Sequence, residues 1–478
     1  MKEQTRIELE NYIEEILTGA DARGAALGVV NADGKVLYQR FFGWRDAERQ
    51  LPIDADTIFG IASVTKSFTA LAIMQLQEAG ILSLEDPVAK YVPEYKDPIG
   101  RPPVRIWHLL CHSGGFFPLP RLVVDKIAQE MGISDSIQEE LVYRKDLAEQ
   151  GIRLVAERLA AQTEFTGAPG QQFSYCNDGF GVLSDIVRRY GGYDSFAEYV
   201  EQKILQPLGM TRSNLGFLRN SLDENAAILY SKESGQWRAD RNYENDAFVL
   251  HGGGAMKSTL TDLMRYVSMY LRGGVSEDGT RILSRAEIRE MMLPRQQVKP
   301  GVTYGYGLQR SQMGVRTLVG HGGSLPGVSS QILLCPEAGI AVVFLCNTMD
   351  VPAAAAAESC MRAWCGEPVR YKAPVLPECA WSEEQRQKLV GTYASGEGDH
   401  FTIVEEKQEL FVQTEGGKRQ LHAVGDWKGL VQGTYGEIWL QPVRTDAGEV
   451  RAAQYGTRTF PKESGADNDT GRTTKLRF

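Results

Sequence analysis

Three short motifs in this chain carry residue types suited to acyl transfer, and the first is Ser63-Val-Thr-Lys66. Good helix formers run from Ser63 to Ala79 and stop at Gly80, so we expect Ser63 at the start of a helix. A spacing of three places the serine hydroxyl and the lysine amine on one helix face. A hydroxyl becomes nucleophilic when a base takes its proton, and a lysine whose pKa is lowered by burial can be that base. Taken alone, the tetrapeptide favours the simpler interpretation of a capping serine followed by an exposed lysine.

The second motif is Tyr175-Cys176-Asn177, which follows a Pro-Gly turn. A phenol has an ordinary pKa of about 10, so it takes part in proton transfer near neutrality only beside a cation. Lys66 is the expected cation. Read without the other motifs, Tyr175 would be a packed aromatic residue and Asn177 a turn residue.

The third motif is His321-Gly322-Gly323-Ser324, which a further glycine precedes. Glycine lets a substrate approach the backbone closely, as an oxyanion hole requires. A glycine-rich surface turn is the alternative interpretation of this motif alone.

The residues around the first motif carry a family resemblance. The segment from Thr57 to Ala70 resembles the nucleophile segment of class C β-lactamases, D-Ala-D-Ala carboxypeptidases and related esterases. The resemblance extends over about residues 7–350, and the three motifs follow in the family's order. Their agreement favours the functional interpretation of each.

This resemblance implies a role for each motif. Ser63 would be the nucleophile that becomes acylated, and Lys66 and Tyr175 would transfer protons. Asn177 would orient the substrate amide. The backbone N–H groups of Ser63 and Ser324 would form the oxyanion hole. Ser324 would lie on a strand together with the other three residues of the third motif.

One departure from the family pattern bears on the substrate. Relatives that recognise a carboxylate carry Lys or His followed by Thr, whereas here His321 is followed by Gly322. The missing hydroxyl predicts weak binding of substrates with a free terminal carboxylate. The sequence leaves open an esterase, a D-amino-acid amidase or aminopeptidase, a carboxypeptidase and a β-lactamase. It also leaves open a penicillin sensor or scaffold that is acylated without turnover.

Two histidines four residues apart, His108 and His112, raise the question of a metal site. No third ligand is spaced to complete one, so we interpret both as structural. The proposed chemistry requires neither a metal nor an organic cofactor.

The expected fold is α/β, with an antiparallel sheet flanked by helices and a helical subdomain within residues 121–162. A small antiparallel β-barrel should follow, because short β-prone runs alternate with turns at Phe401–Glu405, Glu409–Gln413, Lys418–His422, Leu430–Gln432 and Glu437–Pro442. Residues 388–445, which open with Lys388–Tyr393, resemble the barrel appended to some D-aminopeptidases and penicillin-binding relatives. We find no catalytic constellation in this second part. The predicted division is a hydrolase domain at 1–370, a proline-rich linker at 371–380, a lipocalin-like barrel at 381–463 and a disordered tail at 464–478.

Composition limits the partners. A net charge of −9 argues against general affinity for nucleic acid or anionic membranes, and no run of 18 apolar residues predicts a membrane span. The charged N-terminus and seven scattered cysteines predict a cytoplasmic protein with reduced thiols. We expect a small-molecule or short-peptide substrate, and the sequence leaves the oligomeric state undetermined.

Overall fold

The computed structural model describes most of the chain, namely residues 1–120, 145–216, 218–233, 235–241, 243, 251–371, 376–433 and 436–463. Much of the predicted helical subdomain, part of the predicted linker and the predicted tail lie outside these residues. The part of the subdomain that is described contains the expected helix, α5 (Lys145–Ala160).

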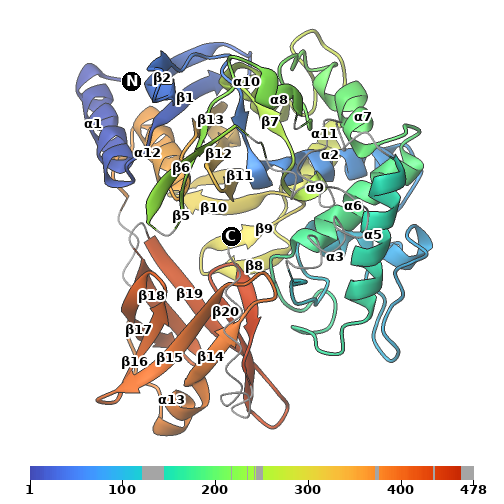
Figure 1. Ribbon diagram of the computed structural model, residues 1–478, viewed down its shortest axis with the longest axis vertical. Coiled ribbons are helices and arrows are strands. Elements are labelled where there is room, and N and C mark those ends of the chain that lie inside the picture. Colours follow the sequence, from blue (N-terminus) through green and yellow to red (C-terminus); the bar gives the residue numbers. More distant parts are fainter. Residues whose placement is uncertain are drawn as a thin grey trace.

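Within the described residues, a nine-stranded antiparallel sheet forms the centre of the larger part (Figure 1). Its order is β3 (Leu51–Pro52), β2 (Val36–Asp46), β1 (Gly24–Asn31), β13 (Ile340–Cys346), β12 (Val328–Cys335), β11 (Arg316–Leu325), β10 (Gln309–Met313), β9 (Val302–Tyr304) and β8 (Gln296–Lys299). The sequence predicts a hairpin from the β-prone runs on either side of the turn-forming Asn31–Gly34, and the structure confirms it. The sequence also predicts adjacent strands at Thr317–Gly320, Ser329–Cys335 and Ile340–Leu345, which β11, β12 and β13 confirm.

Helices cover both faces of the sheet. Helices α1 (Glu3–Gly19) and α12 (Ala353–Cys365) pack on one face, while α2 (Thr65–Glu78) and α10 (Leu260–Leu271) pack on the other. Strand β1 shows the period of two that this requires, because Leu27 and Val29 join one core while Ala26 and Val30 join the other. The apolar stripe of residues 5–18 predicts an amphipathic helix with Thr5 available as its cap. The structure confirms the helix, but it begins after Lys2 and Thr5 is not its cap.

The C-terminal part is a nearly closed eight-stranded antiparallel barrel. Its strands follow chain order: β14 (Gly391–Ala394), β15 (His400–Glu406), β16 (Glu409–Thr414), β17 (Gly417–Gly425), β18 (Lys428–Gly433), β19 (Gly436–Arg444), β20 (Val450–Tyr455) and β21 (Arg458–Pro461). A bridge between Tyr393 and Lys462 brings the first and last strands together. The short helix α13 (Glu383–Leu389), capped by Ser382, precedes it.

The barrel lies against the β8–β9 side of the larger part (Figure 1). Gln454 of β20 donates to the Val298 carbonyl of β8 over 2.9 Å, and Phe117 packs with Val443 and Ala452 of the barrel. The two parts therefore share a packed interface.

All seven cysteines are free. Among the described helices, none has the length and apolar character needed to cross a membrane.

Candidate active site

The first motif forms a strained turn that leads into α2. Ser63 lies in the 3-10 turn η1 (Ala62–Val64), and Ala62 has a φ of 45°, a left-handed conformation that is unfavourable for a residue with a Cβ atom. The Ile61 N–H donates to the Met256 carbonyl over 3.1 Å, and the Thr65 hydroxyl donates to the Ala62 carbonyl over 2.6 Å. These bonds hold the turn in place. Ser63 thus stands at the positive end of α2, as the sequence predicted.

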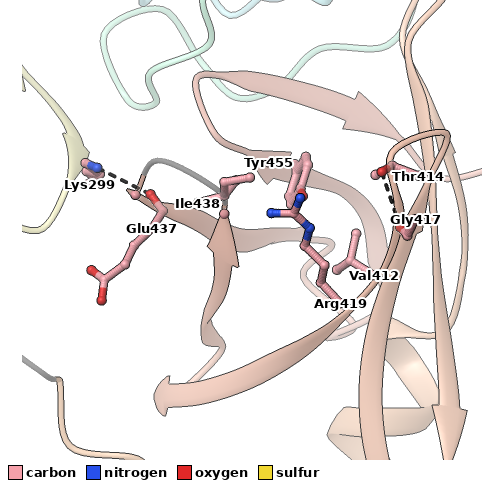
Figure 2. A pocket seen from close by; sticks show the side chains of 10 residues that line it. Lys299, Val412, Thr414, Gly417, Arg419, Glu437, Ile438 and Tyr455 are labelled. Carbon is pink, nitrogen blue, oxygen red and sulfur yellow. Dashed lines mark hydrogen bonds between the residues drawn. The ribbon is translucent and has the colours of Figure 1, made fainter. Parts of the chain in front are cut away.

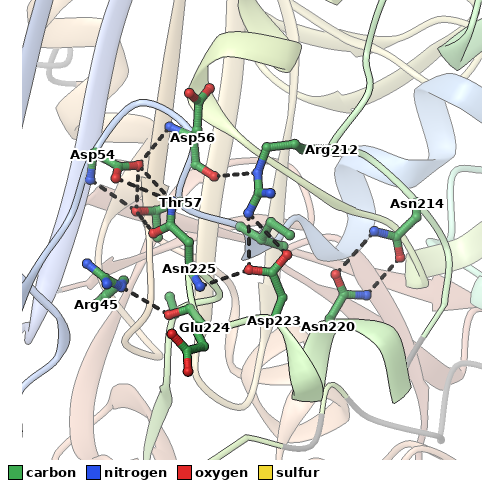
Figure 3. A network of polar contacts seen from close by, with 12 residues as sticks. Arg45, Asp54, Asp56, Thr57, Arg212, Asn214, Asn220, Asp223, Glu224 and Asn225 are labelled. Atoms are coloured by element: carbon green, nitrogen blue, oxygen red, sulfur yellow. Dashed lines mark hydrogen bonds and ion pairs between the residues drawn. The ribbon is translucent and has the colours of Figure 1, made fainter.

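A polar network anchors the loop that leads to this turn (Figure 3). The Asp54 carboxylate accepts from the Asp56 N–H over 2.9 Å, and the Thr57 hydroxyl lies 3.0 Å from Asn225 Oδ1. Arg212 donates to the Asp56 carbonyl over 2.9 Å and pairs with Asp223. The loop is thereby tied to a segment more than 150 positions later in the chain.

Lys66 is buried and its amine has three partners. Nζ lies 3.1 Å from Ser63 Oγ, 2.8 Å from Asn177 Oδ1 and 2.7 Å from the carbonyl oxygen of Gly253 in α9 (His251–Gly254). Burial, assisted by the positive charge of Arg458, holds the pKa of Lys66 well below its ordinary value.

The three contacts fit a neutral amine at Lys66. Two of the partners, Asn177 Oδ1 and the Gly253 carbonyl, can only accept hydrogen bonds. A neutral amine has two protons for these acceptors and one lone pair. The lone pair then faces Ser63 Oγ, where it can take the hydroxyl proton.

Tyr175 lies near the nucleophile, just before α6 (Asn177–Tyr190). Burial raises the pKa of Tyr175, while a hydrogen bond with Ser63 and the charge of Arg458 lower it. The Lys66 amine lies 4.7 Å from the centre of the Tyr175 ring, and the Arg458 guanidinium carbon lies 5.1 Å from it. The sequence predicted Lys66 as the cation beside this phenol, and the structure brings Arg458 to the same ring.

The barrel contributes directly to this site. Glu397, in the turn between β14 and β15, accepts from Asn177 Nδ2 over 2.9 Å, and its other carboxylate oxygen pairs with Arg458 at the start of β21. The Tyr175 N–H donates to the Thr457 carbonyl over 2.9 Å. Sequence reasoning missed Glu397 and Arg458, which lie more than 200 positions after Asn177 and belong to no local motif.

The third motif passes close to the nucleophile turn on β11. A Cβ atom on Gly323 would lie 2.2 Å from the Ile61 carbonyl oxygen and 3.0 Å from the Ser63 nitrogen. Only glycine allows this approach. The next residue is Ser324, so the oxyanion hole predicted from the N–H groups of Ser63 and Ser324 remains an expectation consistent with this packing.

His321 belongs to a buried chain of hydrogen bonds. The Cys176 N–H donates to His112 Nδ1 over 3.1 Å, and His112 Nε2 lies 3.3 Å from the Tyr304 hydroxyl. That hydroxyl lies 2.8 Å from His321 Nε2, and His321 Nδ1 lies 2.6 Å from the Gly322 carbonyl oxygen.

The ends of this chain determine the tautomers. Burial lowers the pKa of His112 well below its ordinary value and that of His321 to about 3, so both rings are neutral near pH 7. Since Gly322 offers an acceptor, His321 Nδ1 carries the proton and Nε2 accepts from Tyr304. His112 Nε2 then donates to Tyr304. Both nitrogens of His321 are therefore engaged within the protein.

The structural interpretation of His108 and His112 agrees with their surroundings. His108 Nδ1 accepts from the Arg105 N–H over 2.8 Å, and the His112 ring packs 4.1 Å from that of Tyr175. In the described part of the chain, no group of three or more His, Cys, Asp or Glu residues is arranged to hold a metal ion.

Known proteins are similar to this chain in sequence. The family described as Beta-lactamase matches residues 9–359. Penicillin-binding protein 4* of Bacillus subtilis is 25% identical over 437 residues, covering 88% of this chain and 90% of that protein. Esterase EstB of Burkholderia gladioli is 35% identical over 188 residues, which are 39% of this chain and 45% of the esterase. D-aminopeptidase of Brucella anthropi is 25% identical, covering 71% of this chain and 59% of that enzyme.

A solved structure extends the likeness over both parts of the chain. The octameric penicillin-binding protein homologue from Pyrococcus abyssi aligns with a TM-score of 0.65 and 28% identity, over 95% of this chain and 99% of that one. The family match spans well over half of the chain and includes all three motifs. The chain belongs to the β-lactamase family.

Proposed function

We propose that this protein is a serine hydrolase that transfers an acyl group to water through an ester on Ser63. The observation that carries the proposal is the position of the buried Lys66 amine. A neutral amine there donates its two hydrogen bonds to Asn177 Oδ1 and the Gly253 carbonyl oxygen, and its lone pair then faces the Ser63 hydroxyl. The esterase, D-aminopeptidase and penicillin-binding protein among its relatives support this reaction class.

In the first half of the reaction, Ser63 Oγ attacks the substrate carbonyl carbon while Lys66 takes the hydroxyl proton. The N–H groups of Ser63 and Ser324 would stabilise the oxyanion, near the positive end of α2. Tyr175, whose hydroxyl interacts with Ser63, gives its phenol proton to the leaving group as the bond to that group breaks, and the proton that Lys66 took is passed back to Tyr175. Water then attacks the acyl-enzyme, giving up a proton along the same path, and Ser63 is regenerated.

Asn177 is the residue proposed to orient the acyl group. Its Oδ1 accepts from Lys66 and one Nδ2 proton goes to Glu397, so the orientation of the amide is defined. The second Nδ2 proton can bind a substrate carbonyl. Glu397 thus acts as a positioning residue supplied by the barrel.

The site favours substrates without a free carboxylate near the scissile bond. His321 is neutral and both of its ring nitrogens are engaged, while Gly322 lacks a hydroxyl. We therefore propose esters and amides as the substrate class, ahead of peptides that end in a free D-residue. As part of this proposal, residues 1–370 are the catalytic domain and 381–463 are an accessory domain that completes the site.

Intact-mass analysis after treatment with a fluorophosphonate probe tests the proposal. One adduct should form, map to the peptide that contains Ser63 and disappear in Ser63→Ala. Ser63→Ala and Lys66→Met should each lower ester turnover by on the order of 10³-fold, because members of one catalytic unit fail together. Arg444→Gln, at the far end of the barrel, is the control. An adduct that survives Ser63→Ala, or acylation with no turnover of any ester, would contradict the proposal.

A further inference from the structure

The barrel contains a cavity at the end that faces the catalytic part. Its volume is about 590 Å³. The lining residues come from the ends of β16 and β18, from the starts of β17 and β19 and from the end of β20. Neighbouring strands of the barrel are antiparallel, so all these positions lie at one end. The turns that carry Glu397 and Thr457 follow β14 and β20 and thus lie at this same end.

The wall combines apolar surface with two cationic side chains and the acidic side chain of Glu437. Val412, Ile438 and Tyr455 supply the apolar part, and Figure 2 shows the Arg419 guanidinium between Ile438 and Tyr455. Lys299 enters from β8 of the catalytic part and donates to the Glu437 backbone carbonyl over 3.4 Å.

We propose that this cavity binds a small amphipathic carboxylate, with its apolar body against Ile438 and Tyr455 and its carboxylate on Arg419. The planar guanidinium carries N–H donors that match a carboxylate, and one of them already donates to the Gln432 carbonyl over 3.2 Å. Lys299 adds a second cation at the mouth. The volume lies within the range of small-molecule sites, where a few placed polar groups orient an otherwise apolar ligand.

The cavity is connected to the catalytic centre through one hairpin. Tyr455 lies directly opposite Arg458 in the β20–β21 ladder, and residues opposite each other project to the same side of a sheet. Arg458 faces the Tyr175 ring, and Thr457 in the intervening turn accepts from the Tyr175 N–H. A ligand held against Tyr455 therefore changes the packing of the hairpin that holds Tyr175. The proposal of binding depends only on the cavity, whereas the proposed effect on turnover rests on the proposed function.

Binding is tested with 4-phenylbutyrate and its neutral amide, 4-phenylbutyramide, on the full-length Ser63→Ala protein by titration calorimetry. The acid should bind at least about tenfold more tightly than the amide, because a hydrogen-bonded charge pair contributes that much or more. Arg419→Gln should remove this difference. Arg444→Gln, at the opposite end of the barrel, should keep it.

A second variant guards against a folding defect. Ile438→Trp narrows the cavity and should weaken the acid and the amide alike, with an unchanged thermal unfolding midpoint. Equal affinity for acid and amide, or full binding by Arg419→Gln, would overturn the site. Loss of binding after fluorophosphonate modification of the wild type would also overturn it, because the probe would then occupy the catalytic centre.

The connection is tested by wild-type turnover of a neutral ester with and without saturating 4-phenylbutyrate. We expect kcat to change at least twofold, and Arg419→Gln to abolish the change at the same probe concentration. Unchanged kcat with demonstrated binding overturns the connection. If Ser63 forms no adduct while calorimetry still shows Arg419-dependent binding, the proposed function fails and the site stands.

Discussion

Replacing Arg458 with glutamine should shift the pH dependence of catalysis in a defined direction. The positive charge of Arg458 lowers the pKa of both Lys66 and Tyr175. Without that charge, the ammonium form of Lys66 is less unfavourable and its pKa rises. Only the free amine can take the Ser63 proton, so activity appears as the pH rises through the pKa of Lys66. The acidic limb of kcat/KM should therefore move to higher pH.

The structure sets the size of this effect. Lys66 Nζ and Arg458 Cζ lie 4.7 and 5.1 Å from the centre of the same tyrosine ring, so they are at most about 10 Å apart. At about that separation, Coulomb's law gives ~0.4 kcal/mol in water and ~1.7 kcal/mol at an effective dielectric constant near 20. The Arg458 side chain is 28% exposed, which places the interaction between these limits. In Arg458→Gln, the ratio of free amine to ammonium at Lys66 should therefore fall by a factor of about 2 to 20 at low pH.

The assay is kcat/KM for a neutral ester from about pH 5 to about pH 10. Arg458→Gln should lose activity by the same factor on the acidic limb and recover toward the plateau at high pH. Glu397→Gln should move the limb to lower pH, because the carboxylate raises the pKa of Lys66. The double variant should lie between the two, and Arg444→Gln should match the wild type. An unmoved limb in Arg458→Gln, or one moved to lower pH, would refute the reasoning.

Three further outcomes follow from the geometry. Gly323→Ala should lower the free energy of unfolding, measured by urea titration, by about 1–3 kcal/mol and abolish turnover, because its Cβ would meet the Ile61 carbonyl oxygen. Gly322→Ala should lower the free energy of unfolding by less, because its Cβ meets the end of a flexible side chain. The wild type should hydrolyse a D-peptide methyl ester with a higher kcat/KM than the same D-peptide with a free terminal carboxylate, since His321 gives no donor to a carboxylate. Gly322→Thr should narrow this gap by raising kcat/KM for the free-carboxylate peptide about 10- to 150-fold, because its hydroxyl restores a donor. Faster hydrolysis of the free-carboxylate peptide by the wild type would contradict this. A chain ending at residue 371 should lose at least tenfold in ester turnover because the barrel completes the site, and full activity of this shorter chain would contradict that role.

The local parts of the site could be predicted from the sequence. Ser63 and Lys66 are three residues apart in a helical segment, so helix geometry alone brings them together. Tyr175 and Asn177 could be placed beside them only through the family resemblance, because no local rule joins segments 111 positions apart. The structure adds a contact that the sequence did not predict, between the Lys66 amine and Asn177 Oδ1.

The barrel's contribution could not be predicted. Five of its eight strands were expected from alternating residues and turns, while β14, β20 and β21 were not. Glu397 and Arg458 lie at turns of the barrel, where charged residues are common, so their types give no signal of a role in the site. Their place beside Asn177 and Tyr175 depends on how the barrel docks on the larger part, and docking leaves no periodic signal in the chain.

The sequence by itself determined which chemical groups are available and the order in which three motifs present them. It also determined the helix that joins Ser63 to Lys66. It determined as well the strands whose alternate side chains are buried on the two faces of the sheet. The tertiary structure decided the protonation of these groups, because the pKa values of Lys66, Tyr175 and His321 depend on burial and on charges brought in by distant segments. It also decided that His321 faces Tyr304 and gives no donor to substrate, since that hydrogen bond exists only once β9 and β11 belong to one sheet.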